Sequence, residues 1–289
     1  MAVVLPLMER YARRVLTGRG FTSRMLDVGD ARIHVYDGPG RGPLPTVVVL
    51  HGIGSAGAPF ARVLAGLQAH ATRVVAPELP GHGFSDPPSG VMTPDRLTET
   101  MIRALDALLP EPAIVCGNSL GGALALAYAL ERPEKVRGLV LLSPAGLKLP
   151  ESELAELRRT FSFDSTRDTR RFLDRLYHRT PVLLSLLASE VREQMARPVV
   201  RHLLETVTPD HGLEPKELAR LSVPTLFLWG ASERILPDLL LEGFRAHLPA
   251  TATIEHPEGY GHCPHLDAPA DVVRRIAAFG ASLNAPASR

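Results

Sequence analysis

The sequence contains few cysteines and almost no net charge. Cys116 and Cys263 are the two cysteines among 289 residues, too few for the disulfide framework of a secreted protein, and their spacing matches no zinc motif. The 32 Lys and Arg residues nearly balance the 31 Asp and Glu residues, so we expect no basic surface that binds nucleic acid. These absences predict a cytoplasmic protein with no nucleic-acid partner.

Long apolar runs are missing as well. No stretch approaches the roughly 18 apolar residues of a membrane span, and the first arginines follow the apolar residues instead of preceding them as in a signal peptide. The N-terminal segment nevertheless places apolar residues at helical spacing beside three arginines: Leu5, Met8, Ala12, Val15 and Leu16, with Arg10, Arg13 and Arg14. We expect a helix that docks on the domain, with weak peripheral contact with a membrane surface as the alternative.

Short apolar runs alternate with helix-length stretches, which is typical of a parallel sheet flanked by helices. The predicted strands are the apolar runs at residues 46–51, 72–76, 113–116, 138–142, 224–229 and 252–256. Residues 150–220 contain no clear β run and carry apolar pairs at helical spacing. We therefore predict an α/β core formed by residues 1–149 and 221–289, with residues 150–220 as a helical cap.

The strongest chemical signal is the segment AIVCGNSLGG at residues 113–122, which is followed by good helix formers. A short strand runs through Gly117-x-Ser119-x-Gly121 directly into a helix. A sharp turn of this kind needs small flanking residues, and it lifts the serine hydroxyl toward a helix N-terminus that favours negative charge. The pattern predicts that Ser119 is a nucleophile rather than a helix cap.

A nucleophilic serine needs a base and an orienting acid, and in this architecture they follow in the order Ser, Asp or Glu, His. Glu233 is the first acid after the apolar run at residues 224–229, and His262 follows the last predicted strand between glycines. We predict that these two residues complete a triad with Ser119. The alternatives are His265 as the base and Asp267 or Asp238 as the acid.

An oxyanion hole is predicted at the end of the first apolar run, which closes with His51-Gly52. A loop in this position supplies one backbone N–H, and the residue after the nucleophile supplies the other. These donors are assigned to Ile53 and Leu120. His51 and His82 are interpreted as structural residues that brace the neighbouring loops.

The same loop has a second interpretation. Residues 52–57 match the pattern G-x-G-x-x-G after a strand, and Glu78 ends the next apolar run, as in a dinucleotide-binding fold. This pattern explains one βαβ unit, whereas the hydrolase interpretation also explains Ser119, Glu233 and His262. A metal site at residues 262–267 is disfavoured because no second group of ligands is spaced to complete it.

With these residues in view, the chain resembles the α/β-hydrolase superfamily over residues 30–283. The matching pieces are VVVLHGIG, VVAPELPGHGFSDP, GNSLGGALALAYALERPEKVRGLVLLSPAGL, VPTLFLWGASERILP and GYGHCPHLDAP. The resemblance implies an eight-stranded, mostly parallel sheet with a cap inserted after the sixth strand, near Pro150. It also implies the roles already given to Ser119, Glu233 and His262.

Within this superfamily the chain is similar to capped bacterial esterases and lipases and to monoacylglycerol lipase-like enzymes. Meta-cleavage C–C bond hydrolases share the GNS elbow but often carry Trp after the base, where this chain has Cys263. The acid position usually holds Asp, so the longer Glu233 must set its carboxylate back to meet the imidazole.

We therefore expect a serine hydrolase that cleaves short or medium acyl esters, or monoacylglycerol-like lipids, through an acyl-enzyme. No cofactor or metal is expected. A C–C bond hydrolase with the same triad is the alternative, followed by a non-catalytic small-ligand binder and a dinucleotide-binding protein. Candidate substrate contacts lie in the oxyanion loop, the cap and the segment after the base: Gly52, Phe161, Phe163, Phe172, Leu176 and Cys263.

Overall fold

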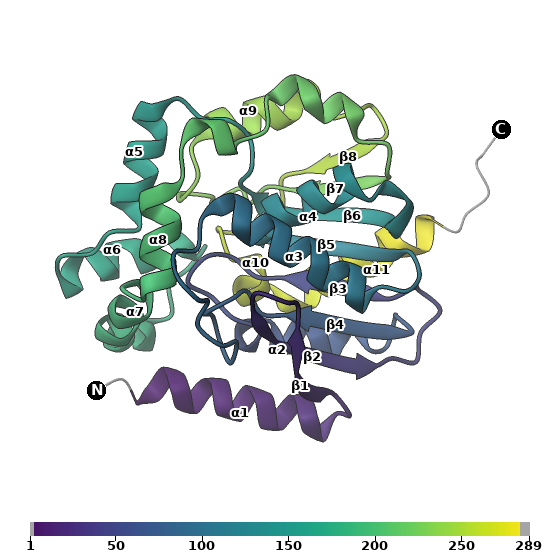
Figure 1. The fold of residues 1–289 in the computed structure, drawn as a ribbon, viewed down its shortest axis with the longest axis horizontal. Coiled ribbons are helices and arrows are strands. Elements are labelled where there is room, and N and C mark those ends of the chain that lie inside the picture. The colour runs from purple at the N-terminus through teal and green to yellow at the C-terminus, as the bar shows by residue number, and fades with distance from the viewer. Residues whose placement is uncertain (1–2, 284–289) are drawn as a thin grey trace.

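The computed structural model describes residues 3–283, apart from the side chains of residues 182, 183 and 185. Eight strands form one sheet in the order β1-β2-β4-β3-β5-β6-β7-β8 (Figure 1). Their bounds are β1 (Thr22–Asp27), β2 (Arg32–Pro39), β3 (Val47–Leu50), β4 (Arg73–Pro77), β5 (Ala113–Ser119), β6 (Val136–Pro144), β7 (Thr225–Leu228) and β8 (Ala252–Glu255).

The strand pairs β1/β2 and β2/β4 are antiparallel, and the remaining pairs are parallel. The predicted α/β class with a mostly parallel eight-stranded sheet is confirmed. The central strands β3 and β5 are buried along their whole length, as expected for parallel strands covered on both faces. The strands β1 and β2 were not predicted from apolar runs. The half-exposed residues of the edge strand β1 form no such run, and in β2 polar residues stand between the apolar ones.

Helices cover both faces of the sheet. On one face α1 (Val4–Gly18), α2 (Ala61–Leu67) and α11 (Pro269–Ser282) bury apolar residues against the sheet, and on the other α3 (Pro94–Leu108), α4 (Leu120–Glu131) and α9 (Asp238–His247) do so. The shorter elements of this core are η1 (Ala58–Phe60), η2 (Pro133–Lys135) and α10 (Pro264–Asp267). The result is one apolar core on each side of the sheet.

Between β6 and β7 the described chain forms helices joined by loops, with one isolated bridge that pairs Leu147 with Leu213. Its elements are α5 (Glu151–Thr160), α6 (Thr166–Leu176), η3 (Val182–Leu187), α7 (Ala188–Met195), α8 (Pro198–Thr206), η4 (Pro209–His211) and η5 (Pro215–Arg220). Helices α5 to α8 gather on one side of the molecule (Figure 1, left). The helical segment therefore follows the sixth strand, where the resemblance placed the cap.

The N-terminal helix α1 docks on the core, as expected, through four of the five apolar residues that the sequence places at helical spacing. Leu16 is fully buried, and Leu5, Ala12 and Val15 are partly buried, but Met8 is 52% exposed. The prediction was wrong for Met8 because the helix shows two apolar faces and turns the second toward solvent. No helix among residues 3–283 combines the length and apolar character needed to cross a membrane.

Candidate active site

Ser119 ends β5 and directly precedes α4. Its backbone has φ 55° and ψ −120°, a conformation that is unfavourable for a residue with a side chain and that collects at functional sites. The flanking glycines allow this turn: a Cβ on Gly117 would lie 2.0 Å from the carbonyl oxygen of Gly121, and a Cβ on Gly121 would lie 2.3 Å from that of Leu50. The turn thus has the tight geometry that the sequence motif predicts.

Glu233 and His262 meet beyond the carboxyl ends of β7 and β8. The Nδ1 atom of His262 donates to Oε2 of Glu233 at 2.8 Å, and the two side chains are 4% and 2% exposed. Oε1 of Glu233 accepts the backbone N–H groups of Ile235 at 2.8 Å and Leu236 at 3.1 Å. The longer glutamate side chain is therefore set back in the loop and still reaches the imidazole.

These contacts fix the charge of the acid and the tautomer of the base. Burial raises the pKa of Glu233, but the charge and hydrogen bond of His262 and the N–H groups of Ile235 and Leu236 outweigh burial and hold it below its ordinary value. Because Nδ1 of His262 faces a carboxylate, it carries a proton, which leaves Nε2 as a proton acceptor in the neutral ring. This is the state that a general base requires.

Asn118 connects the serine turn to the histidine loop. Its Nδ2 group donates to the backbone carbonyls of Leu142 and His262, both at 2.9 Å. Within residues 3–283 the Ser119 hydroxyl makes no hydrogen bond to the His262 ring; such bonds often tighten only when substrate is bound. This role of Asn118 was not predicted, and its place directly before Ser119 was the available signal.

The alternative triad residues are engaged elsewhere. The His265 ring stacks on Phe60 with centroids 3.6 Å apart, and burial, with smaller effects of His262 and His51, lowers its pKa to about 3. The Asp267 carboxylate accepts the backbone N–H groups of Gly261 and His178. Asp238 is exposed at the start of α9. Among the described residues, His262 therefore has Glu233 as its carboxylate partner.

The predicted oxyanion loop lies against Ser119. A Cβ on Gly52 would be 3.2 Å from the Cβ of Ser119 and 3.6 Å from its Oγ. The Gly52 carbonyl accepts from Nδ1 of His51 at 2.8 Å and from the N–H of Ser55 at 3.2 Å. Because a trans peptide points its N–H opposite to its carbonyl, these bonds turn the N–H of Ile53 away from His51.

His51 braces this loop from behind. Its Nε2 atom accepts the N–H of Leu79 at 3.0 Å, so both ring nitrogens form hydrogen bonds with backbone groups.

Leu120 is the first residue of α4, and its N–H is one of the helix donors without an intrahelical partner. Leu120 directly follows Ser119 and the Gly52–Ile53 peptide lies against it, and the role of Ile53 and Leu120 as oxyanion donors stays a prediction.

Glu78 is occupied in a way that disfavours the dinucleotide interpretation. The carboxylate is fully buried, where it pairs with Nδ1 of His34 at 2.9 Å and accepts the N–H groups of Gly57 at 2.8 Å and Phe84 at 2.7 Å. A ribose hydroxyl would need this carboxylate free. A Cβ on Gly57 would also meet the Tyr36 ring at 2.8 Å, so packing accounts for this glycine.

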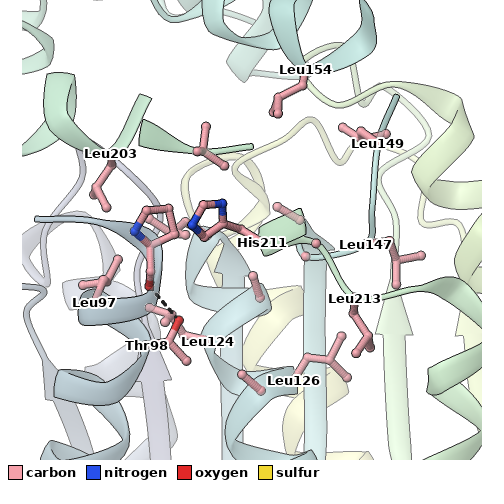
Figure 2. A pocket seen from close by; sticks show the side chains of 18 of the residues that line it. Leu97, Thr98, Leu124, Leu126, Leu147, Leu149, Leu154, Leu203, His211 and Leu213 are labelled. Atoms are coloured by element: carbon pink, nitrogen blue, oxygen red, sulfur yellow. Dashed lines mark hydrogen bonds between the residues drawn. The ribbon is translucent and has the colours of Figure 1, made fainter. Parts of the chain in front are cut away.

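A cavity of about 640 Å³ opens beside Ser119, Ile53 and Leu120. Leucines dominate its wall, and they come from α3, α4, the helices between β6 and β7 and the loops next to them (Figure 2). They include Leu97, Leu124, Leu126, Leu147, Leu149, Leu154, Leu203 and Leu213. A leucine-lined cavity of this size can hold the apolar part of a small ligand.

The charged residues that line this cavity are mostly acidic. They are Asp95, Glu99, Glu131, Asp210, Glu217 and Arg158, with His211 as a further titratable side chain. Arg158 donates to Glu151 and to the carbonyl of Val207, so its charge is already compensated. Most of the acids are compensated as well, for example Asp210 by Lys148 and Glu217 by Arg220. Arg158 is the one guanidinium in the described lining.

The predicted substrate contacts divide between cavity and core. Phe161 lines the cavity, and Gly52 lies against Ser119. The structure does not bring Phe163, Phe172, Leu176 or Cys263 to the cavity wall. Phe172 packs edge-to-face on Phe161 with centroids 5.2 Å apart, and the carbonyl of Leu176 accepts the N–H of Cys263.

Comparisons with known proteins identify relatives of two kinds. A family model described as alpha/beta hydrolase fold matches residues 45–269, more than half of the chain. A 2-hydroxymuconate semialdehyde hydrolase from Pseudomonas putida is 31% identical over 201 residues, which cover 66% of this chain and 71% of the relative. Lipase 1 from Psychrobacter immobilis is 28% identical over 276 residues, covering 91% of this chain and 84% of the relative.

A solved structure extends the similarity to nearly the whole chain. The crystal structure of a membrane phospholipase A, described as a bacterial virulence factor, superposes with a TM-score of 0.82 at 26% identity. The match covers 97% of this chain and 93% of that chain.

Proposed function

This chain is a hydrolase that belongs to the alpha/beta hydrolase family, and we propose that it cleaves uncharged carboxylic esters with an apolar acyl chain. The observation that carries this proposal is the buried Glu233–His262 pair, fixed beside the Ser119 turn at the end of a leucine-lined cavity. We assign Ser119 as the nucleophile, His262 as the base and Glu233 as the orienting acid.

In the proposed reaction, Ser119 Oγ bonds to the ester carbonyl carbon while its proton passes to Nε2 of His262. The carbonyl electrons move onto oxygen, and the N–H groups of Ile53 and Leu120 stabilise that oxyanion. Each donor of this type contributes about 10²–10³ in rate. Glu233 stabilises the imidazolium through the 2.8 Å hydrogen bond.

Collapse of the tetrahedral species breaks the ester C–O bond, and the leaving alkoxide takes the proton from His262. Water then attacks the acyl-enzyme, passing a proton to the same nitrogen. The second collapse releases the carboxylic acid and returns the proton to Ser119 Oγ. The protein groups end as they began, so this scheme uses no cofactor.

C–C bond hydrolysis is the second candidate, because some of the similar proteins are named for it. One from Cupriavidus pinatubonensis is called a 2-hydroxy-6-oxononadienedioate hydrolase, and a dioate carries two negative charges. In the described lining, such a dianion would meet a leucine-rich wall with a single guanidinium, that of Arg158, which Glu151 already shares. The lining therefore favours a neutral ester.

The test is turnover of p-nitrophenyl esters of increasing acyl length, with a vinylogous diketone acid as the C–C substrate. The wild type should hydrolyse the esters, and the Ser119→Ala variant should lose this activity. The wild type should cleave the diketone much more slowly than the esters. Ser222→Ala, an exposed serine before β7, is the matched control and should keep full activity. Undiminished activity of Ser119→Ala, or preferred cleavage of the diketone, would overturn the proposal.

A further inference from the structure

Helix α1 has a second apolar face that nothing in the described chain covers. Val4, Leu7, Met8 and Tyr11 follow the spacing i, i+3, i+4, i+7 and are 42%, 56%, 52% and 71% exposed. This spacing puts them on one side of a helix. The docked side, which carries the fully buried Leu16, lies farther round the helix.

Exposed large apolar side chains are concentrated at this helix. Of the eight such residues in the described chain, five lie within residues 3–11: Val3, Val4, Leu7, Met8 and Tyr11. A sixth, Leu186, lies just before α7, whose Glu190 carboxylate accepts the N–H groups of Val4 and Leu5. Apolar side chains gathered in this way on a folded protein mark an interaction site.

The charges on α1 specify what the face would bind. Arg10, Arg13 and Arg14 are exposed, and the guanidinium of Arg13 lies over the Phe84 ring. Glu9, the acid of this helix, turns inward, where burial and the charge of Glu78 raise its pKa. The outward side of α1 is therefore apolar and cationic, which is the composition of helices that lie in the surface of an anionic membrane.

We propose that α1 is an interfacial helix that binds the surface of a bilayer containing anionic lipid. Val4, Leu7, Met8 and Tyr11 would enter the boundary between headgroups and acyl chains, while Arg10 and Arg14 contact lipid phosphates. A second copy of the chain fits less well, because pairing two α1 helices through this face brings their arginines together without an outward acid to pair with them. The proposal does not depend on the catalytic assignment.

The experiment is co-sedimentation of the full chain with vesicles of phosphatidylcholine alone or mixed with phosphatidylglycerol. The wild type should bind the mixed vesicles, and less so as salt is added. Each arginine near an anionic surface contributes about 1 kcal/mol, so Arg10→Gln/Arg14→Gln should bind roughly thirtyfold more weakly. Leu7→Asn/Tyr11→Asn should weaken binding to both kinds of vesicle at least tenfold.

Matched controls come from exposed residues elsewhere. Val91→Asn/Leu239→Asn removes two other exposed apolar side chains, and Arg245→Gln removes an exposed charge on α9; both should bind like the wild type. Light scattering without vesicles should give the same mass for all variants. The proposal is wrong if phosphatidylglycerol does not increase binding of the wild type, or if the α1 variants bind vesicles as the wild type does. It is also wrong if the wild type is a dimer in solution and the α1 variants are monomers.

Discussion

Replacing Glu233 by glutamine tests how the acid controls the base. The glutamine carbonyl must face the N–H groups of Ile235 and Leu236, which Oε1 of Glu233 accepts now at 2.8 and 3.1 Å, because an amide NH₂ there would oppose two donors. The NH₂ group then points at Nδ1 of His262. That nitrogen has to become an acceptor, so the proton moves to Nε2, where it blocks abstraction of the Ser119 proton.

The expected loss follows from this tautomer change and from burial. The side chains of His262 and Glu233 are both nearly inaccessible. Water therefore cannot take the place of the lost carboxylate and stabilise the imidazolium. A wrong tautomer in a serine triad lowers kcat by about 10⁴, which corresponds to roughly 5.5 kcal/mol of transition-state stabilisation. KM should change little, because Glu233 does not line the cavity.

The assay is steady-state hydrolysis of a p-nitrophenyl ester by Glu233→Gln, Glu233→Asp and the control Glu258→Gln, which changes an exposed glutamate in the loop before His262. Glu233→Asp keeps the charge and should retain more activity than Glu233→Gln, and the control should match the wild type. Activity of Glu233→Gln within tenfold of the wild type would refute the reasoning.

Three further results are expected. The pKa of Glu233 is held below its ordinary value near 4.5, so its ionised form stabilises the fold above that pH, and this stabilisation disappears as the pH falls through the lower folded pKa. In urea titrations the difference in free energy of unfolding between wild type and Glu233→Gln should shrink as the pH is lowered below 4.5, and a constant difference would contradict the reasoning. Asn118→Ala removes the amide that donates to the carbonyls of Leu142 and His262, which should cost about 2–3 kcal/mol in urea unfolding and lower kcat. An unchanged midpoint would show that the amide does not hold the two segments together. Leu203→Trp fills the cavity, so kcat/KM should fall at least tenfold for a long acyl ester and little for an acetate; equal losses would place the acyl chain elsewhere.

The parts of the fold and site that could be predicted from the sequence are those that short, continuous segments determine. The glycines around Ser119 determine a local turn. Ser119, Glu233 and His262 each lie at or after the carboxyl end of a parallel strand, and these ends share one edge of the sheet. The acid remained open among Glu233, Asp238 and Asp267, because the choice depends on which loop folds back toward His262. That direction is a tertiary property.

The cavity and the N-terminal helix depended on packing that no local pattern contains. The lining leucines, such as Leu97, Leu147 and Leu203, lie in separate elements, and each is an ordinary core residue in its own segment. The aromatic residues between β6 and β7 were the more conspicuous signal, yet Phe172 packs on Phe161 instead of facing the cavity. For Met8, helical spacing was visible in the sequence, but the side of α1 that contacts the core was not.

The most direct measurement is to map the residue that reacts with a fluorophosphonate probe by mass spectrometry of the digested protein. The proposed chemistry predicts one adduct per chain, located on Ser119, absent in Ser119→Ala and formed much more slowly in Glu233→Gln. An unlabelled wild-type protein, or an adduct on another residue that persists in Ser119→Ala, would contradict the assignment of Ser119 as the nucleophile.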